Sequence, residues 1–147
     1  MKTDPVSPAR ILLVDDNHLG LVARQMILQE QGYGVDTALS GEEAWEIFQK
    51  TRFDVVVTDY RMGGMDGLKL IALIRSAEAP VRIVLLSGFV ECLGMTAESS
   101  GADEVIRKSN KEVPELLRAV KKLLHNPPRR GVSSEPGKKA RKADQTG

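Results

Sequence analysis

Four short runs with apolar centres, each followed by a polar side chain, constrain the fold most strongly. They are residues 11–14 before Asp15 and Asp16, residues 53–58 before Asp59, residues 82–86 before Ser87, and residues 103–107 before Lys108. Runs of this length that are apolar at nearly every position are typical of strands buried on both faces, as in parallel sheets. The carboxyl ends of parallel strands lie at one edge of the sheet, where ligands bind. The sequence therefore predicts that three carboxylates, a hydroxyl and an ammonium converge there.

Amphipathic segments lie between these runs and predict helices. We expect helices over residues 17–31, from residue 40, from residue 66, over residues 89–100 and from residue 109 to about 124, and one more strand over residues 33–39. Residues 40–43 and 109–112 both read S-x-x-E, the pattern of a helix capping box. Asp66 is a further N-cap candidate. Five strands alternating with five helices predict an α/β fold with a doubly wound, five-stranded parallel sheet and right-handed crossovers.

Length and charge predict one folded domain over residues 10–125. The chain has 147 residues, enough for one hydrophobic core and too few for two. Residues 126–147 hold six basic and two acidic side chains, so the rest of the chain has a net charge of −3. This basic tail contains too little apolar surface to offset the entropy of ordering, and we expect it and residues 1–9 to be disordered. A solvated tail is favoured over a tail that contacts nucleic acid.

Several classes of protein are disfavoured by the composition. No apolar stretch reaches the length of a membrane span, and residues 1–10 lack the apolar core of a signal peptide, so we expect a cytoplasmic protein with no membrane segment. The single cysteine, Cys92, excludes an internal disulfide and a multi-cysteine metal site. We expect no DNA-binding or other output domain after residue 125, because the tail is short and polar.

The expected cluster of carboxylates requires something that offsets its repulsion. Each pair about 4 Å apart costs about 4 kcal/mol at an effective dielectric of ~20. A divalent cation, a lysine or protonation can offset this, and an all-oxygen ligand set favours Mg²⁺ or Ca²⁺ over zinc. The set suits phosphoryl transfer to a carboxylate, in which Asp59 is the nucleophile and Asp15, Asp16 and Asp59 bind Mg²⁺. Lys108 and Ser87 would then bind the remaining phosphoryl oxygens.

Each of these residues also has a simpler explanation. Asp15 or Asp16 can cap the helix that follows, and Asp59 can be an ordinary turn residue at the end of a strand. Ser87 and Lys108 are individually unremarkable at strand ends. Their joint occurrence at the carboxyl ends of successive strands favours a functional site.

The same stretches resemble the receiver domain of the two-component response regulators. The resemblance covers about residues 9–125 and rests on residues 11–16, 54–59, 65–67, 86–88 and 101–108. It implies a flavodoxin-like sheet of strand order 2-1-3-4-5, with Mg²⁺ as the cofactor. It also implies that a sensor histidine kinase or a phosphotransfer protein donates the phosphoryl group, that an unidentified protein reads the signal, and that the domain has at most slow autophosphorylation and autodephosphorylation activity.

The resemblance also implies a role for each residue of the expected site. Asp59 would be the phosphoacceptor, Asp15 and Asp16 metal ligands, Ser87 the switch hydroxyl and Lys108 the phosphate-binding lysine. The backbone carbonyl of Arg61 would complete the metal shell.

Three positions depart from the family pattern. Gly63 stands where a proline commonly follows the methionine of the acceptor loop, and Ser109 stands where a proline commonly follows the lysine. Val105 stands where an aromatic residue usually rotates on activation. The first two changes are expected to loosen the loops around the metal and phosphate, and the third to weaken the usual switch.

Two other classes of function compete with a stand-alone receiver. An aspartate-dependent phosphohydrolase would use the acids of the first strand, but its usual D-x-D spacing is absent because Asp15 and Asp16 are adjacent. A degenerate receiver that serves only as an interaction module would not need the full acidic set. We therefore favour a phosphoacceptor receiver.

Overall fold

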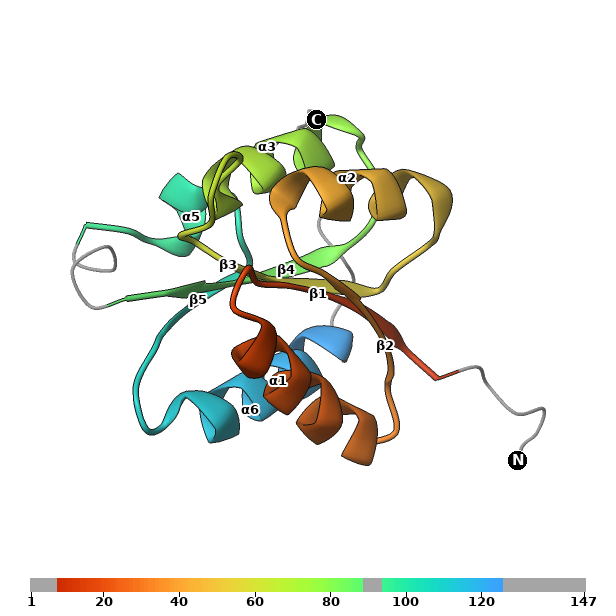
Figure 1. Cartoon of the computed structure of the whole chain (residues 1–147), viewed down its shortest axis with the longest axis vertical. Coiled ribbons are helices and arrows are strands. Elements are labelled where there is room, and N and C mark those ends of the chain that lie inside the picture. Colours follow the sequence, from red (N-terminus) through yellow and green to blue (C-terminus); the bar gives the residue numbers. More distant parts are fainter. Residues whose placement is uncertain (1–7, 89–93, 126–147) are drawn as a thin grey trace, which may run out of the picture.

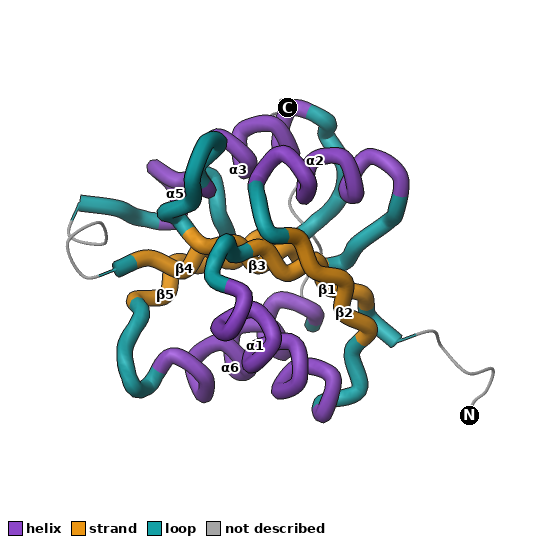
Figure 2. Tube along the Cα trace, in the orientation of Figure 1, coloured by secondary structure: helices purple, strands orange, loops and turns teal. Residues whose placement is uncertain are grey.

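Five parallel strands form a single sheet at the centre of the protein (Figures 1 and 2). The computed structural model describes residues 8–88 and 94–125. The strands are β1 (Arg10–Val14), β2 (Gly34–Ala38), β3 (Val55–Asp59), β4 (Arg82–Ser87) and β5 (Glu104–Arg107), and they lie in the order β2-β1-β3-β4-β5. This confirms the predicted fold class and strand order.

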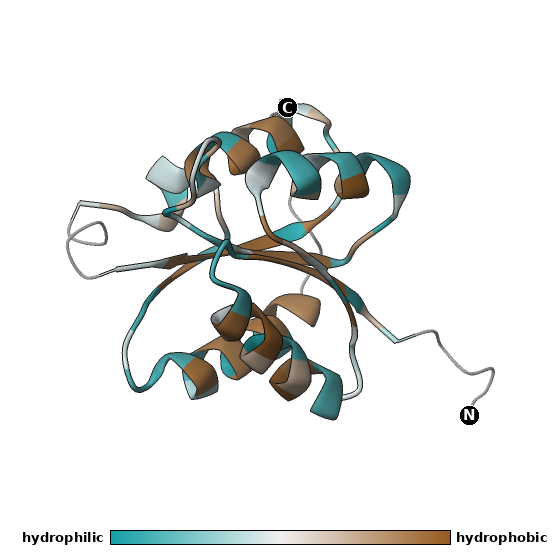
Figure 3. Ribbon diagram, in the orientation of Figure 1, coloured by the Kyte–Doolittle hydropathy of each residue, from teal (hydrophilic) through white to brown (hydrophobic). Residues whose placement is uncertain are grey.

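Helices cover both faces of the sheet (Figure 1). One face carries α1 (His18–Glu30) and α6 (Glu112–Leu124), and the other carries α2 (Gly41–Lys50), α3 (Gly67–Ser76) and α5 (Ala97–Ser100). Buried apolar side chains form one core cluster on each face. The strands between them are largely hydrophobic (Figure 3), as the near-continuous apolar runs predicted.

The strand register brings the carboxyl ends of the strands to one edge of the sheet. Val14 pairs with Thr58, Asp59 pairs with Leu86, and Ser87 pairs with Arg107. All five residues of β3 are buried, including Asp59 at its end. The polar residues that follow β1 and β5, and Ser87 at the end of β4, are therefore placed beside Asp59.

The predicted capping box at residues 40–43 is half formed. Ser40 is the N-cap of α2, and its hydroxyl accepts a hydrogen bond from the backbone N–H of Glu43. The Glu43 carboxylate accepts from the backbone N–H of Leu39 rather than from that of Ser40. The helix start was thus predicted correctly, while the reciprocal bond lies one residue earlier.

The predicted capping box at residues 109–112 is wrong. The last helix begins at Glu112, and the Ser109 hydroxyl accepts a hydrogen bond from the backbone N–H of Lys111. The physical reason is that Glu112 has another partner, because its carboxylate binds Arg24 of α1.

The predicted helix over residues 89–100 is wrong over residues 94–96 and untested over residues 89–93, which lie outside the described residues. Helix α5 begins only at Ala97, because Thr96 and Ser99 form a reciprocal capping box. It ends at Gly101 as predicted, with φ of 83°.

Cys92, residues 1–7 and the basic tail also lie outside the described part of the chain. Within that part, no helix has the length and apolar character needed to cross a bilayer.

Candidate functional site

Three carboxylates converge at the carboxyl edge of the sheet. One carboxylate oxygen from each of Asp15, Asp16 and Asp59 lies within 4.8 Å of the others. Asp15 and Asp59 are buried, while Asp16 is exposed to solvent. They meet because β1 and β3 are adjacent parallel strands that end side by side. An oxygen-only cluster of this size fits a hard divalent cation such as Mg²⁺.

Lys108 supplies a positive charge to this cluster. Its Nζ lies 2.5 Å from Oδ1 of Asp59. The backbone N–H of Lys108 donates a 2.7 Å hydrogen bond to the carbonyl of Ser87, which fixes the end of β5 against β4. The lysine is one of the groups that the sequence analysis required to offset the carboxylate repulsion.

The pKa of the Asp59 carboxyl is raised above its ordinary value. Burial is the largest cause, because it penalises the charged form, and the negative charge of Asp15 acts in the same direction. The hydrogen bond and charge of Lys108 and the charge of Arg24 lower the pKa but do not outweigh burial. Asp59 is therefore more basic than an exposed aspartate.

A small cavity opens beside Asp59. It has a volume of about 160 Å³ and is lined by Asp59, Tyr60, Arg61, Gly88 and Lys108. Ser87, which precedes Gly88, is buried at the end of β4. The structure thus brings Arg61, Ser87 and Lys108 to the same edge as the acids. The role of the Arg61 carbonyl as a metal ligand stays a prediction.

The loop after Asp59 is held from both sides. The backbone N–H of Gly63 donates to Oδ2 of Asp16 at 3.1 Å, and the backbone N–H of Met65 donates to Oε2 of Glu42 at 3.1 Å. Gly64 between them has φ of 76°, which glycine adopts without strain. The loop is therefore anchored to one of the expected metal ligands.

Gly67 allows α3 to begin directly behind the acceptor strand. A Cβ at this position would overlap the backbone carbonyl oxygen of Asp59 and lie 3.0 Å from the Cα of Tyr60. Asp66 caps the helix, because its carboxylate accepts from the backbone N–H of Lys69 at 2.9 Å. The predicted N-cap is thus confirmed, and glycine after it is a steric requirement.

Arg24 is a residue of the site that the sequence analysis missed. Its Nη1 lies 2.5 Å from Oδ2 of Asp15, and its Nε lies 2.6 Å from Oε2 of Glu112. Side chains on a helix tilt toward its N-terminus, so an arginine two turns into a helix that follows an acidic pair can reach back to it. That placement is the signal from which Arg24 could have been found.

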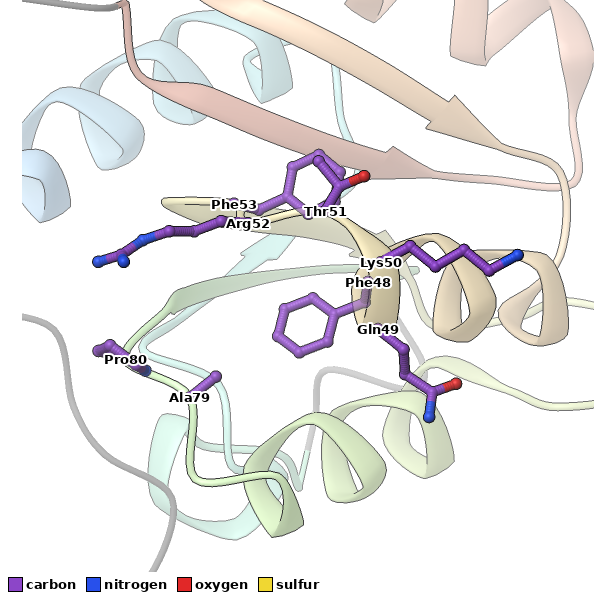
Figure 4. A pocket seen from close by; sticks show the side chains of 8 residues that line it. All are labelled: Phe48, Gln49, Lys50, Thr51, Arg52, Phe53, Ala79 and Pro80. Atoms are coloured by element: carbon purple, nitrogen blue, oxygen red, sulfur yellow. The ribbon is translucent and has the colours of Figure 1, made fainter.

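A second cavity lies at the opposite edge of the sheet (Figure 4). It has a volume of about 330 Å³, and its lining comes from the end of α2 and the segments that precede β3 and β4. The lining residues are Phe48, Gln49, Lys50, Thr51, Arg52, Phe53, Ala79 and Pro80. None of them is acidic, so the carboxylate chemistry belongs to the other edge.

Comparison with known proteins identifies the family. The family model of the response regulator receiver domain matches residues 11–121. The chain belongs to this family. The response regulator protein TrrA of Thermotoga maritima, solved in complex with Mg²⁺-BeF, is 37% identical with a TM-score of 0.70, over 78% of this chain and 98% of that one. The protein is thus a receiver domain of two-component signalling.

Curated relatives include both small and very large proteins. Sporulation initiation phosphotransferase F of Bacillus subtilis is 28% identical over 116 residues, which are 78% of this chain and 93% of that protein. Probable histidine kinase 1 of Oryza sativa subsp. indica is 39% identical over 70 residues, which are 48% of this chain. This chain spans only 7% of the length of that kinase.

Proposed function

We propose that Asp59 accepts a phosphoryl group from a histidine of a sensor kinase or a phosphotransfer protein. The observation that carries this proposal is the convergence of Asp15, Asp16 and Asp59, with Lys108 bound to Asp59. A buried, basic carboxylate beside a lysine and a small cavity provides a nucleophile and a place for the incoming group.

The transfer step requires only a nucleophile and stabilisation of charge. An Asp59 carboxylate oxygen attacks phosphorus and forms an O–P bond, while the N–P bond to the donor imidazole breaks. The imidazole nitrogen keeps the electron pair and takes a proton. Lys108 stabilises the negative charge on the equatorial phosphoryl oxygens, and the Ser87 hydroxyl donates to one of them.

We further propose that Asp15, Asp16 and Asp59, together with the backbone carbonyl of Arg61, hold Mg²⁺. The all-oxygen character and the spacing of the three carboxylates support this assignment. When bound, the ion would offset the charge of the carboxylates and of a phosphoryl oxygen. In this proposal the phosphorylated domain acts in the cytoplasm, signals through altered contacts with a protein partner, and hydrolyses its own acyl phosphate slowly.

The test is intact-mass analysis after incubation with Mg²⁺ and a small acyl phosphate or phosphoramidate donor. We expect one added phosphoryl group in the parent, and none in Asp59→Asn or after chelation of the metal. A phosphohydrolase that used the first-strand acids would instead lose the covalent phosphate in Asp15→Asn and keep it in Asp59→Asn. A degenerate receiver would show no added mass in the parent.

A further inference from the structure

The side chain of Arg24 connects the acidic site to helix α6. It lies in the middle of α1, and its guanidinium binds Asp15 of the cluster with one nitrogen and Glu112 at the start of α6 with another. Helices α1 and α6 lie side by side on one face of the sheet (Figures 1 and 2). One side chain therefore links a proposed metal ligand to α6, a helix that contributes no proposed metal ligand.

The bridge is shielded from water. The side chains of Arg24, Asp15 and Glu112 are 12%, 2% and 13% exposed, respectively. Burial alone would lower the pKa of Arg24, but its hydrogen bonds and charge interactions with Glu112 and Asp15 raise it overall. Arginine also keeps its charge at any pH at which a protein folds. The site thus contains a permanent, poorly screened cation.

The guanidinium competes directly for a carboxylate of the cluster. Oδ2 of Asp15 accepts from Arg24, while Oδ1 accepts from the backbone N–H of Asn17 at 2.9 Å. Both oxygens of this carboxylate are therefore already engaged. A Cβ at Gly20 would lie 3.5 Å from both Arg24 Nη1 and Asp15 Oδ2, so any longer side chain there would begin in contact with the ion pair.

We propose that Arg24 is a resident counter-cation that competes with the divalent metal for Asp15, and that Glu112 retains the guanidinium when the metal takes its place. This inference rests on the proposed function, because it assumes that Asp15 is a metal ligand. Metal binding would then loosen the link between the site and α6. Arg24 acts through Asp15 and is a positioning residue. Its charge also lowers the pKa of Asp59.

A purely structural ion pair makes the opposite prediction about metal affinity. If Arg24 only held Asp15 in place, its removal would leave the carboxylate disordered and Mg²⁺ would bind more weakly. If Arg24 competes, its removal relieves a repulsion and frees a ligand oxygen, so Mg²⁺ binds more tightly. The loss of one charge-assisted hydrogen bond corresponds to roughly ten- to hundredfold in affinity.

The experiment is calorimetric titration of MgCl₂ into the full chain and its variants. We expect Arg24→Gln to bind Mg²⁺ at least about tenfold more tightly than the parent. Arg24→Lys should lie between the two, because one ammonium cannot bind Asp15 and Glu112 in the same forked manner. Glu112→Gln should bind more weakly, because the displaced guanidinium then loses its second partner.

Lys122→Gln is the matched control. Lys122 pairs with Glu104 at 2.6 Å on the exposed side of α6, and its removal changes net charge by the same amount. We expect its Mg²⁺ affinity to stay within about twofold of the parent, since exposed pairs are well screened. Affinity in Arg24→Gln that is equal to or weaker than in the parent would overturn the inference.

A measurement on the parent covers the case in which Arg24→Gln does not fold. The side-chain Nη1–H resonance of Arg24 should shift in step with Mg²⁺ binding, because Nη1 loses its hydrogen bond to Asp15 while Nε keeps its hydrogen bond to Glu112. If the backbone amides of Asp15 and Asp16 shift and this resonance does not, the competition is excluded. A parent that binds no Mg²⁺ would instead overturn the proposed metal site, and this inference with it.

Discussion

The ammonium of Lys108, the residue directly after β5, lies 2.5 Å from Oδ1 of Asp59, which closes β3 two strands away in the sheet. The pair is asymmetric, because the Asp59 side chain is 6% exposed and that of Lys108 is 34% exposed. Water therefore screens the charge of the lysine, while it solvates the buried carboxylate only poorly. This explains how the pKa of Asp59 is raised by burial even though a cation is in contact with it.

The first prediction concerns the pH dependence of stability without metal. Because the folded pKa of Asp59 exceeds its unfolded value of about 3.9, the folded state binds more protons between these two values. The contribution of Asp59 to stability is therefore fully present below the unfolded pKa and is lost as the pH rises through the folded pKa. Asp59→Asn has no carboxyl group to titrate at this position. Its free energy of unfolding relative to that of the parent should therefore increase between the unfolded and the folded pKa of Asp59.

Urea denaturation in EDTA over a range of pH measures this difference. In Lys108→Met the fall in stability should extend to higher pH, because the lysine lowers the Asp59 pKa in the parent. Asp36→Asn, which removes a carboxylate on β2 outside the cluster, is the control for net charge. If Asp59→Asn loses stability relative to the parent as the pH rises, the pKa of Asp59 is lowered and the assignment of burial as the dominant cause is wrong.

The second prediction concerns the glycine behind the acceptor. Gly67→Ala places a methyl group against the backbone of Asp59 and Tyr60, which cannot yield as a flexible side chain would. We expect a loss of about 1–3 kcal/mol in the free energy of unfolding, as for other overpacked sites. Denaturant melts of the purified variant measure it.

Gly63→Ala is the matched control in the same loop. A Cβ at Gly63 meets no described atom within 4 Å. Its backbone N–H remains available to Asp16, and alanine reduces the entropy of the unfolded chain, so we expect a change between zero and a gain of about 1 kcal/mol. Equal effects at the two glycines would show that steric contact with Asp59 is not the reason for Gly67.

The convergence of the acidic cluster could be predicted from the sequence because it depends only on the backbone. Continuous apolar runs predict buried parallel strands, and parallel strands end at the same edge. Asp15, Asp59 and Ser87 each follow or close such a run, and Lys108 follows a short strand with only two apolar residues. Their meeting therefore requires no knowledge of side-chain conformations.

The partners of the charged side chains could not be predicted in the same way. The S-x-x-E pattern at residues 109–112 is a sound local signal, but Arg24 offers Glu112 a stronger, charge-assisted partner that is 88 residues away in the chain. The sequence also does not show that Arg24 offsets the negative charge of Asp15 while Lys108 offsets that of Asp59. Such choices depend on how α1 and α6 pack together.

The third prediction concerns Asp16 and the thermal midpoint. Mg²⁺ at about 100 times its Kd should stabilise the parent by about 2.7 kcal/mol, or roughly 10 °C in the thermal midpoint of a domain of this length. Asp16→Asn keeps an oxygen that can accept from Gly63 and removes one of the three repelling charges. Its midpoint in EDTA should therefore equal or exceed that of the parent, while most of the Mg²⁺-dependent increase is lost.

Differential scanning fluorimetry with and without MgCl₂ measures both effects. Asp36→Asn should keep the full Mg²⁺-dependent increase, since Asp36 pairs with Arg10 away from the cluster. A midpoint of Asp16→Asn in EDTA that lies clearly below the parent would show that hydrogen bonding to the Gly63 loop outweighs the repulsion.

The last prediction concerns Val105, which stands where the family usually has an aromatic switch residue. Val105 lies on β5 opposite Leu85 and packs, partly buried, against the core cluster that also contacts Met95. An aromatic ring at this position would bury on the order of 100 Å² more apolar surface when it turned inward, worth ~2.5 kcal/mol at ~25 cal/mol per Å². That is as large as a typical allosteric coupling energy.

We therefore expect phosphorylation to shift the face formed by α5, β5 and α6 only weakly. The larger response should lie in the Gly63 loop and in α1, which contact the acidic cluster directly through Asp16 and Arg24. Amide chemical shifts with and without a beryllofluoride phosphate mimic measure this in the parent and in Val105→Tyr. The tyrosine variant should gain shifts over residues 94–124, because its ring supplies the missing coupling. Large shifts over those residues in the parent, not enlarged by the tyrosine, would show that this receiver transmits its signal through β5 without an aromatic switch.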